Sequence, residues 1–309
     1  MIGLPNLGNT CYVNTALQCL WACDSFRNYV NVHDNAFSVS TVFESKRLPQ
    51  RVHSYQNMIR KIITYIPVLD LRNQMDIHEF LSFYFDYFFE TNKRVIRIQK
   101  PLLCTGNKRI SYNLDAHWFN TYSEVCDLVY GQYLIQTTCL SCDHSVYNYE
   151  SCSVLSLAIP QHQTCIDTCI DEYFSDTTVE RKCDKCKYGH SVRKTFLCKC
   201  PDIIICCLKR FQLSGTMFSK QTTPIRISNT LNLHKFTKFN KSESLYKLKS
   251  IALHHGNLDD GHYNALICSG DDFVYIDDLK SESVSASKVN KVIASKNYMI
   301  FYERASVSL

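Results

Sequence analysis

The chain has little glycine, little proline and no long apolar segment. Only nine Gly and seven Pro occur among its 309 residues, which disfavours long flexible linkers. No uncharged apolar run reaches the length of about 18 residues that a membrane-spanning helix needs. The N-terminal segment lacks the basic start and the apolar stretch of a secretory signal peptide. These absences predict an intracellular protein, cytoplasmic, nuclear or both, that does not bind membranes.

A strong charge of one sign is also missing. The formal net charge is +5, and the Lys and Arg residues are scattered. Nucleic-acid recognition usually needs basic and aromatic residues gathered on one face, and the short basic groups at 93–100 and 181–187 do not provide it. We therefore expect no nucleic-acid partner. A hydrophobic content of 45% with 20% charged residues is typical of a globular protein.

Cysteine, by contrast, is abundant, with seventeen residues. Without a secretion signal, metal ligands, a nucleophile or buried thiols explain these cysteines better than a disulfide framework does. Their spacing separates the roles. Cys11 stands alone beside an expected helix start, four others form two C-x-x-C pairs, and Cys206 and Cys207 lie in an apolar run that is typical of a buried core.

Hydrophobic periodicity predicts helices in the first part of the chain. One is expected from about Cys11 to Trp21. A second is expected from about Asp76 to Glu90, because Asp76 and Glu79 have the spacing of a capping box. The apolar residues that follow Glu79 surround this helix, so it should be buried on more than one side.

Strand patterns predominate in the rest of the chain. The segments with strand character are 202–208, 262–268, 273–277 and 297–302. We therefore predict an α+β protein with one domain over 1–309. Its first part, to about 125, is helical; its second part, about 126–210, has strands that carry the two cysteine pairs; its last part, about 211–309, consists mainly of strands.

Cys11 has the local setting of a nucleophile. The turn-forming sequence of Gly8, Asn9 and Thr10 leads directly into a helix, whose N-terminal dipole favours the reactive thiolate. The same turn exposes backbone N–H groups that can stabilise an oxyanion. Asn6, five residues upstream, can add a side-chain amide donor. The alternative is a buried cysteine at a helix start, which is a common feature.

Among the eleven histidines, His262 is the candidate base, at the start of an expected strand. A cysteine nucleophile needs a base, and the base needs a third group to orient it. A two-residue turn at 269–270 would pair His262 with Asp277, with Cβ atoms about 4.5–5.5 Å apart. An odd loop or a bulge would bring Asp278 to that face instead. We favour Asp277; the alternative is an ordinary strand histidine near an unrelated acidic pair.

The two C-x-x-C pairs predict a structural zinc site. They consist of Cys139, Cys142, Cys183 and Cys186. Structural zinc is typically bound by four such ligands in a tetrahedron, and with all four positions filled no position remains for substrate or water. We therefore expect one structural Zn²⁺ and no catalytic metal. Reduced cysteines without a metal are the alternative.

Together these features resemble the ubiquitin-specific proteases, a family of papain-like cysteine deubiquitinases. The segments that carry the resemblance are GLPNLGNTCYVN (3–14), QMDIHEFL (74–81), the two C-x-x-C pairs, LKRF (208–211), HHG (254–256), GHY (261–263), YIDD (275–278) and the closing strand at 298–304. These segments occur in the family's order along nearly the whole chain, which argues strongly against a chance resemblance. Met75, where a polar residue is usual, and Phe273, where Trp is frequent, depart from the family pattern.

The resemblance implies a fold shaped like a hand. The helical first part would be a thumb, the middle part zinc-ribbon fingers, and the last part a β-sheet palm. Asn6 matches the oxyanion-stabilising residue. Asp76 matches the acidic residue that binds the ubiquitin tail, and Gln74 matches its neighbour, which supports the cysteine loop. Helix capping by Asp76 would leave it less freedom to bind the tail.

The activity implied is thiol-dependent hydrolysis of isopeptide bonds at the C-terminal Gly of ubiquitin. The expected partners are ubiquitin and ubiquitinated proteins, and the chain is expected to act as a monomer. Two alternatives stay open: an isopeptidase for another ubiquitin-like modifier, and a ubiquitin-binding module without turnover.

Overall fold

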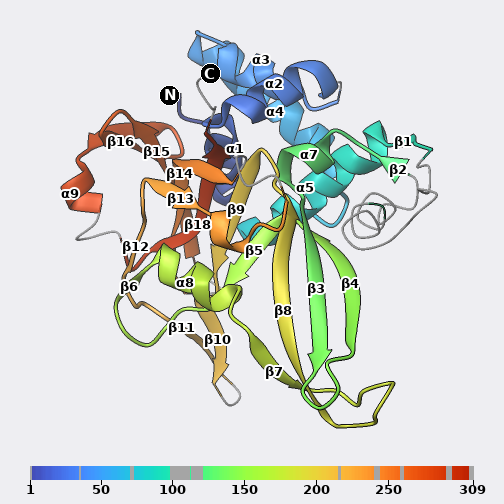
Figure 1. Cartoon of the computed structure of the whole chain (residues 1–309). Helices are drawn as coiled ribbons and strands as arrows, with labels where there is room; N and C mark the ends of the chain where they lie inside the picture. Colours follow the sequence, from blue (N-terminus) through green and yellow to red (C-terminus); the bar gives the residue numbers. More distant parts are fainter. Residues whose placement is uncertain are drawn as a thin grey trace.

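A computed structural model describes residues 2–34, 36–69, 73–97, 112, 121–214, 217–239, 244–257, 261–289 and 294–305. Helices, a four-stranded sheet and an eight-stranded sheet form three regions, with the four-stranded sheet extending away from the other two (Figure 1). In the part of the chain described, no helix is both long and apolar enough to cross a membrane.

The first region is helical, as the periodicity predicts. Its helices are α1 (Cys11–Trp21), α2 (Asp24–His33), α3 (Val39–Glu44), α4 (Leu48–Tyr65), α5 (Ile77–Asn92) and α7 (Val125–Val129). The predicted bounds of α1 are confirmed, and its residues from Cys11 to Leu20 are all buried. Asp76 caps α5 through His78 N–H, which it accepts at 2.7 Å.

The four-stranded sheet forms the projecting region. It contains β3 (Gly131–Cys139), β4 (Ser145–Cys152), β7 (Thr177–Glu180) and β8 (His190–Lys199), in the order β4-β3-β8-β7 and antiparallel throughout. The first cysteine pair lies at the far end of β3, and the second lies between β7 and β8. The sheet topology therefore brings both pairs to one tip (Figure 1).

The eight-stranded sheet carries the main core. It contains β5 (Val154–Leu157), β9 (Ile203–Leu208), β13 (Thr230–Asn232), β14 (Leu245–Gly256), β15 (Gly261–Ser269), β16 (Asp272–Asp277), β17 (Lys280–Val284) and β18 (Asn297–Arg304). Ala265 and Ile267 of β15 join the core that includes α1, whereas Leu266 joins the core on the other face. This period of two shows that the sheet is buried on both faces.

The middle part of the chain contributes to both sheets. Strands β5 and β9, which the sequence grouped with the cysteine-bearing strands, belong to the eight-stranded sheet, where β9 pairs with β5 on one side and with β18 on the other. All six residues of β9 are buried. A fully apolar strand needs cover on both faces, and the large sheet provides it.

Short elements complete the fold. They are β1 (Arg94–Val95), β2 (Thr121–Tyr122), β6 (Thr164–Cys165), α8 (Ile166–Tyr173), β10 (Phe211–Ser214), β11 (Met217–Lys220), β12 (Ile225–Arg226), the 3-10 helix η1 (His234–Phe236) and α9 (Ala286–Lys288). The antiparallel hairpin of β10 and β11 forms a separate two-stranded sheet.

Candidate active site

Cys11 is the first residue of α1 and is 4% exposed. Two residues before the helix have left-handed backbone angles, with φ of 97° at Gly8 and 49° at Asn9. The side-chain oxygen of Asn6 organises this turn, since it accepts the N–H of Gly8 at 3.1 Å and that of Thr10 at 3.2 Å. Thr10, the N-cap residue, makes no side-chain capping bond. The sulfur therefore lies at the positive end of the helix dipole.

His262 lies between Cys11 and Asp277. Its Nε2 is 2.7 Å from Oδ1 of Asp277, which leaves Nδ1 as the ring nitrogen for Cys11. The hydrogen bond with Cys11, and after it the hydrogen bond with Asp277, raise the pKa of His262 to about 9 against the opposing effect of burial. The imidazole can therefore hold a proton at neutral pH while keeping a fixed orientation.

The neighbouring histidines have the opposite electrostatic setting. His255 lies directly across the β14–β15 pair from His262, and His254 precedes it. Burial, followed by nearby positive charge, lowers the pKa of His254 to about 3 and that of His255 to about 4. Of these three rings, only His262 has a pKa that allows it to hold a proton at neutral pH.

The hairpin that brings His262 to Asp277 differs from the predicted one. The predicted turn at 269–270 was wrong: Ser269 pairs with Asp272, so the turn consists of Gly270 and Asp271. This moves the register by two, and His262 is not directly opposite Asp277. Because side chains alternate with a period of two, both residues still share a face. Residues 258–260 of the preceding loop lie outside the described residues.

Asp278 has a different position from its neighbour. Its Oδ2 accepts Nδ2 of Asn6 at 3.0 Å, and its Oδ1 accepts Nδ2 of Asn14 at 2.6 Å. Its carbonyl oxygen also accepts the N–H of Leu4 at 3.0 Å. Asp277 thus contacts the histidine, whereas Asp278 holds the segment before Cys11. Sequence reasoning missed this role, and the left-handed φ of 49° at Asp278, which redirects its side chain, has no clear signature in sequence.

Asp76 and Gln74 line a cavity of about 260 Å³ together with Met75, Glu79, Phe211, His254 and Tyr263. One oxygen of Asp76 caps α5, and the other accepts the hydroxyl groups of Tyr298 and, at 3.4 Å, Tyr263. Both oxygens of this carboxylate are therefore engaged, and the helix cap among these contacts agrees with the prediction from the sequence. The sequence did not indicate the two tyrosine contacts.

Gln74 supports the histidine side of the site. Its Oε1 accepts the N–H of Gly261, the residue before His262, at 2.9 Å. This hydrogen bond reaches β15, and the expectation that Gln74 supports the cysteine loop stays a prediction. The extended segment before α5 passes the start of β15, which brings this side chain within reach of Gly261.

The four predicted zinc ligands meet at the tip of the four-stranded sheet. The Sγ atoms of Cys139 and Cys186 are 3.5 Å apart and those of Cys142 and Cys183 are 3.7 Å apart; all four lie within 4.8 Å of one another. A tetrahedron with Zn–S bonds of about 2.3 Å requires sulfurs about 3.8 Å apart. The cluster therefore fits one zinc ion.

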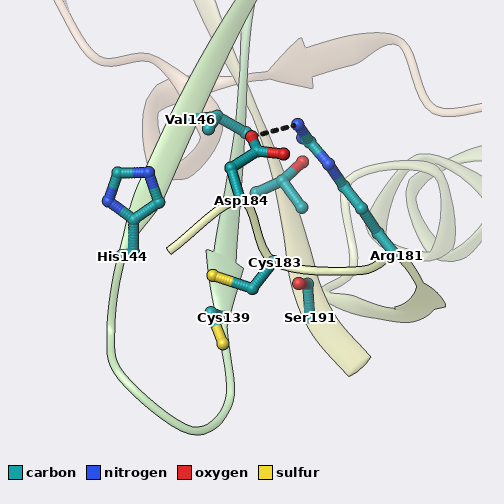
Figure 2. A pocket seen from close by; sticks show the side chains of 8 residues that line it. Cys139, His144, Val146, Arg181, Cys183, Asp184 and Ser191 are labelled. Atoms are coloured by element: carbon teal, nitrogen blue, oxygen red, sulfur yellow. Dashed lines mark ion pairs between the residues drawn. The ribbon is translucent and has the colours of Figure 1, made fainter. Parts of the chain in front are cut away.

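The two cysteine turns have the same local geometry. Asp143 N–H binds the carbonyl of Cys139 at 3.2 Å, and Lys187 N–H binds that of Cys183 at 3.0 Å. Both Asp143 and Lys187 have a left-handed φ, 54° and 66°. Figure 2 shows the Cys139 and Cys183 sulfurs close together. The ion pair of Arg181 with Asp184, 3.6 Å long, lies beside them.

Comparison with known proteins agrees with this arrangement. The family model described as "Ubiquitin carboxyl-terminal hydrolase" matches residues 2–302. The chain belongs to this family. Ubiquitin carboxyl-terminal hydrolase Usp2 of Drosophila melanogaster is 25% identical over 98% of this chain and 35% of its own length. Ubiquitin carboxyl-terminal hydrolase 2 of Rattus norvegicus is 27% identical over 99% of this chain and 54% of its own length. The chain spans about a third to a half of these relatives.

A solved structure shares the fold. It is the SAGA DUB module of Ubp8, Sgf11, Sus1 and Sgf73 bound to monoubiquitin. The matched chain has a TM-score of 0.78 and 21% identity, over 99% of this chain and 69% of its own length. The α+β, papain-like fold class predicted from the sequence is confirmed.

Proposed function

We propose that this protein is a thiol-dependent deubiquitinase that hydrolyses isopeptide bonds at the C-terminal Gly of ubiquitin. The observation that carries the proposal is the arrangement of Cys11, His262 and Asp277: Nε2 of His262 lies 2.7 Å from Oδ1 of Asp277, and the nearby thiol of Cys11 is the main cause of the raised pKa of this imidazole. Family membership supports the substrate class, because the relatives are named ubiquitin carboxyl-terminal hydrolases.

In the proposed reaction, Nδ1 of His262 takes the proton of Cys11, and the thiolate attacks the carbonyl carbon of the terminal Gly. Asp277 keeps the ring in the required tautomer. The tetrahedral oxyanion accepts hydrogen bonds from Asn6 Nδ2 and from backbone N–H groups at the start of α1. His262 then returns the proton to the departing lysine amine, which leaves a thioester. Water, deprotonated by His262, hydrolyses the thioester and frees Cys11.

Asn6 is suited to the oxyanion role by its contacts. An amide nitrogen has two donors, and Asp278 accepts one of them, so the orientation of the other is set. The turn that Asn6 organises also lies directly before Cys11. A fixed donor costs no reorganisation when charge develops on the carbonyl oxygen.

The ubiquitin tail would bind in the cavity that Asp76 and Gln74 line. Asp76 and Glu79 supply carboxylates there, and a basic segment of peptide is their natural partner. Because its oxygens are already engaged by α5 and two tyrosines, Asp76 would contribute as a rigid, pre-oriented acceptor. Gln74 would act mainly by holding Gly261.

A zinc ion would be bound by Cys139, Cys142, Cys183 and Cys186. It would hold the tip of the four-stranded sheet together and would supply no reaction step, because all four of its positions would be filled by protein. We further propose that residues 1–309 form one catalytic domain of thumb, fingers and palm, which acts as an intracellular monomer on ubiquitinated proteins and binds neither nucleic acid nor membranes.

The direct test is a ubiquitin probe with a thiol-reactive group at its C-terminus. The wild-type protein and Cys165→Ala should form an adduct, whereas Cys11→Ala should form none. Cys165 is a demanding control, because a hydrogen bond with Thr168 lowers the pKa of its thiol and it is partly exposed. Turnover of a fluorogenic ubiquitin substrate by Cys11→Ala should fall by at least about 10⁴-fold.

The same experiment separates the alternatives. Adducts formed only with probes for other ubiquitin-like modifiers would replace the substrate and keep the chemistry. A folded, zinc-loaded protein that binds ubiquitin but reacts with no probe would be a binding module, and the proposed activity would be wrong.

A further inference from the structure

Lys220, the last residue of β11, has three hydrogen-bond acceptors around its ammonium group. Its Nζ lies 2.8 Å from Nδ1 of His254, 2.9 Å from the carbonyl oxygen of His254 and 2.7 Å from the carbonyl oxygen of Gly256. An ammonium has three N–H donors, so these contacts use all of them. The end of β14 is therefore held by one side chain from the separate β10–β11 hairpin.

The ring of His254 is buried in an aromatic cluster. Its centroid is 5.2 Å from that of Phe211, 4.7 Å from that of Tyr263 and 5.8 Å from that of Tyr298. Burial, and after it the charge of Lys220, lower the pKa of His254 to about 3, so the ring is neutral. Because the ammonium donates to Nδ1, the single ring proton is on Nε2.

Nε2 of His254 packs against Gly261, the residue before His262. A Cβ added to Gly261 would lie 2.2 Å from this nitrogen and 2.9 Å from the carbonyl oxygen of Asn257, so only glycine fits. Gln74 accepts the N–H of the same glycine. The backbone that leads into His262 is thus held by the ring of His254 and by Gln74.

We propose that Lys220 is a positioning residue for the reaction at Cys11. Its ammonium fixes the ring of His254 and the end of β14, and through Gly261 these fix the imidazole of His262. The three acceptors converge on one nitrogen, which suits the compact ammonium of lysine better than the planar fork of arginine. No contact in the described part of the structure joins Lys220 to Cys11, His262 or Asp277, so it would act through the residues that it holds.

The charge state of Lys220 fits this role. Burial, followed by the nearby Arg210 and Lys296, lowers the pKa of Lys220 to about 8, so the ammonium is still mostly protonated at pH 7. Its Nζ also lies over the ring of Phe211, 5.7 Å from the ring centroid. Among the described residues, this cation is held by three acceptors and lies near an aromatic ring, and no carboxylate forms an ion pair with it.

The first measurement is turnover of a fluorogenic ubiquitin substrate, and it rests on the proposed function. Lys220→Met keeps the apolar length and removes all three donors. We expect kcat to fall by about 10–100-fold, with a much smaller change in KM, because a misplaced base affects the reaction more than binding. Lys247→Met, at an exposed position of β14, is the matched control and should leave kcat unchanged.

The second measurement does not need ubiquitin. The rate of Cys11 alkylation by iodoacetamide at about pH 6, read from the Cys11 peptide by mass spectrometry, reports the pairing of thiolate with imidazolium. Lys220→Met should lower this rate, and Lys247→Met should not. If no ubiquitin substrate is turned over by the wild-type protein, the proposed function fails, while the alkylation rates still test the role of Lys220.

Chemical rescue distinguishes positioning from general stabilisation. Ethylammonium should restore part of the kcat of Lys220→Ala, where the removed side chain leaves space, and should not restore that of Lys220→Met. If Lys220→Met does not fold, folded Lys220→Arg decides: a lowered kcat supports the proposal. Wild-type kcat and wild-type Cys11 alkylation in a folded Lys220→Met or Lys220→Arg would overturn it.

Discussion

At both cysteine sites of this protein, the chain turns through left-handed backbone angles next to a sulfur. At the candidate active site, Asn9 has φ of 49° and lies two residues before Cys11. At the tip of the four-stranded sheet, Asp143 and Lys187 have φ of 54° and 66°, and each follows a cysteine pair. At the candidate active site, the sulfur of Cys11 lies next to the imidazole of His262, which can exchange protons. The tip sulfurs face one another, which suits a metal ion.

The two sites also differ in how far apart their parts lie in the chain. Sulfurs at the tip come from residues 47 and 41 positions apart. At the candidate active site, Asn6 donates a hydrogen bond to Asp278, which lies 272 positions later in the sequence. The start of helix α1 there packs near a strand from the other end of the chain. The cysteine turns at the tip can therefore be recognised from their spacing in the sequence. The geometry of the candidate active site depends instead on how two distant regions pack.

Apart from the loss of Cys11, the largest loss of turnover at the candidate active site is expected when Asp278 is replaced. Asp278→Asn keeps a residue that tolerates the left-handed φ but replaces one acceptor of Asn6 or Asn14 with a donor. We expect kcat for a fluorogenic ubiquitin substrate to fall by about 10²-fold, with KM little changed, since an oxyanion forms only in the reaction. Asp271→Asn, in the exposed β15–β16 turn, is the control. Wild-type kcat in Asp278→Asn would contradict this role.

A smaller effect on turnover is expected from the pairing of His262 with Asp277, and it depends on pH. The raised pKa of His262, about 9 against an ordinary 6.5, means that its pairing stabilises the fold fully below pH 6.5 and that this contribution is lost as pH rises through 9. Turnover, which needs the ring proton for the leaving amine, should fall over the same upper range.

Replacing Asp277 tests this assignment. Asp277→Asn removes one of the causes that raise the pKa of His262, so the falling limb of the pH profile of kcat/KM should move to lower pH. A displacement of one pH unit would lower kcat/KM about tenfold on that limb. The control Asp271→Asn should keep the wild-type profile. If the limb stays in place in Asp277→Asn, the carboxylate does not set the protonation of His262.

The smallest effect on the candidate active site is expected when a cysteine of the zinc cluster is replaced. Cys183→Ser should reduce bound zinc from about one equivalent to near zero, measured by metal analysis of the purified protein. Alkylation of Cys11 by iodoacetamide should stay within about twofold of the wild-type rate, because distant sites act independently. Cys165→Ser, outside the cluster, should keep its zinc. Retained zinc in Cys183→Ser would remove this residue from the ligand set.

Local sequence patterns predicted several elements accurately. The helix from Cys11 to Trp21 and the cap at Asp76 follow from spacing and from side chains that act within one turn. The buried strand β9 follows from an unbroken apolar run. Such features depend on neighbours in sequence, so no knowledge of the packing is needed.

Register and side-chain partners were harder to predict. The hairpin turn was placed one residue too early, and Asp277 kept its face only because the resulting register change was even. The sequence did not indicate the hydrogen bond between Gly261 and Gln74, because this bond depends on where two distant segments meet. Turn position has weak sequence signals when Ser, Gly and Asp occur together.

The sequence by itself determined the α+β class, the helix start at Cys11, the candidate base His262 and the two cysteine pairs, because each depends on local spacing or chemistry. Only the tertiary structure decided that Nε2 of His262 faces Asp277 and that Asp278 holds Asn6. The first contact joins two neighbouring strands, and the second joins opposite ends of the chain, 272 positions apart. Their partners are selected by the packing of α1 against the sheet, to which residues throughout the core contribute.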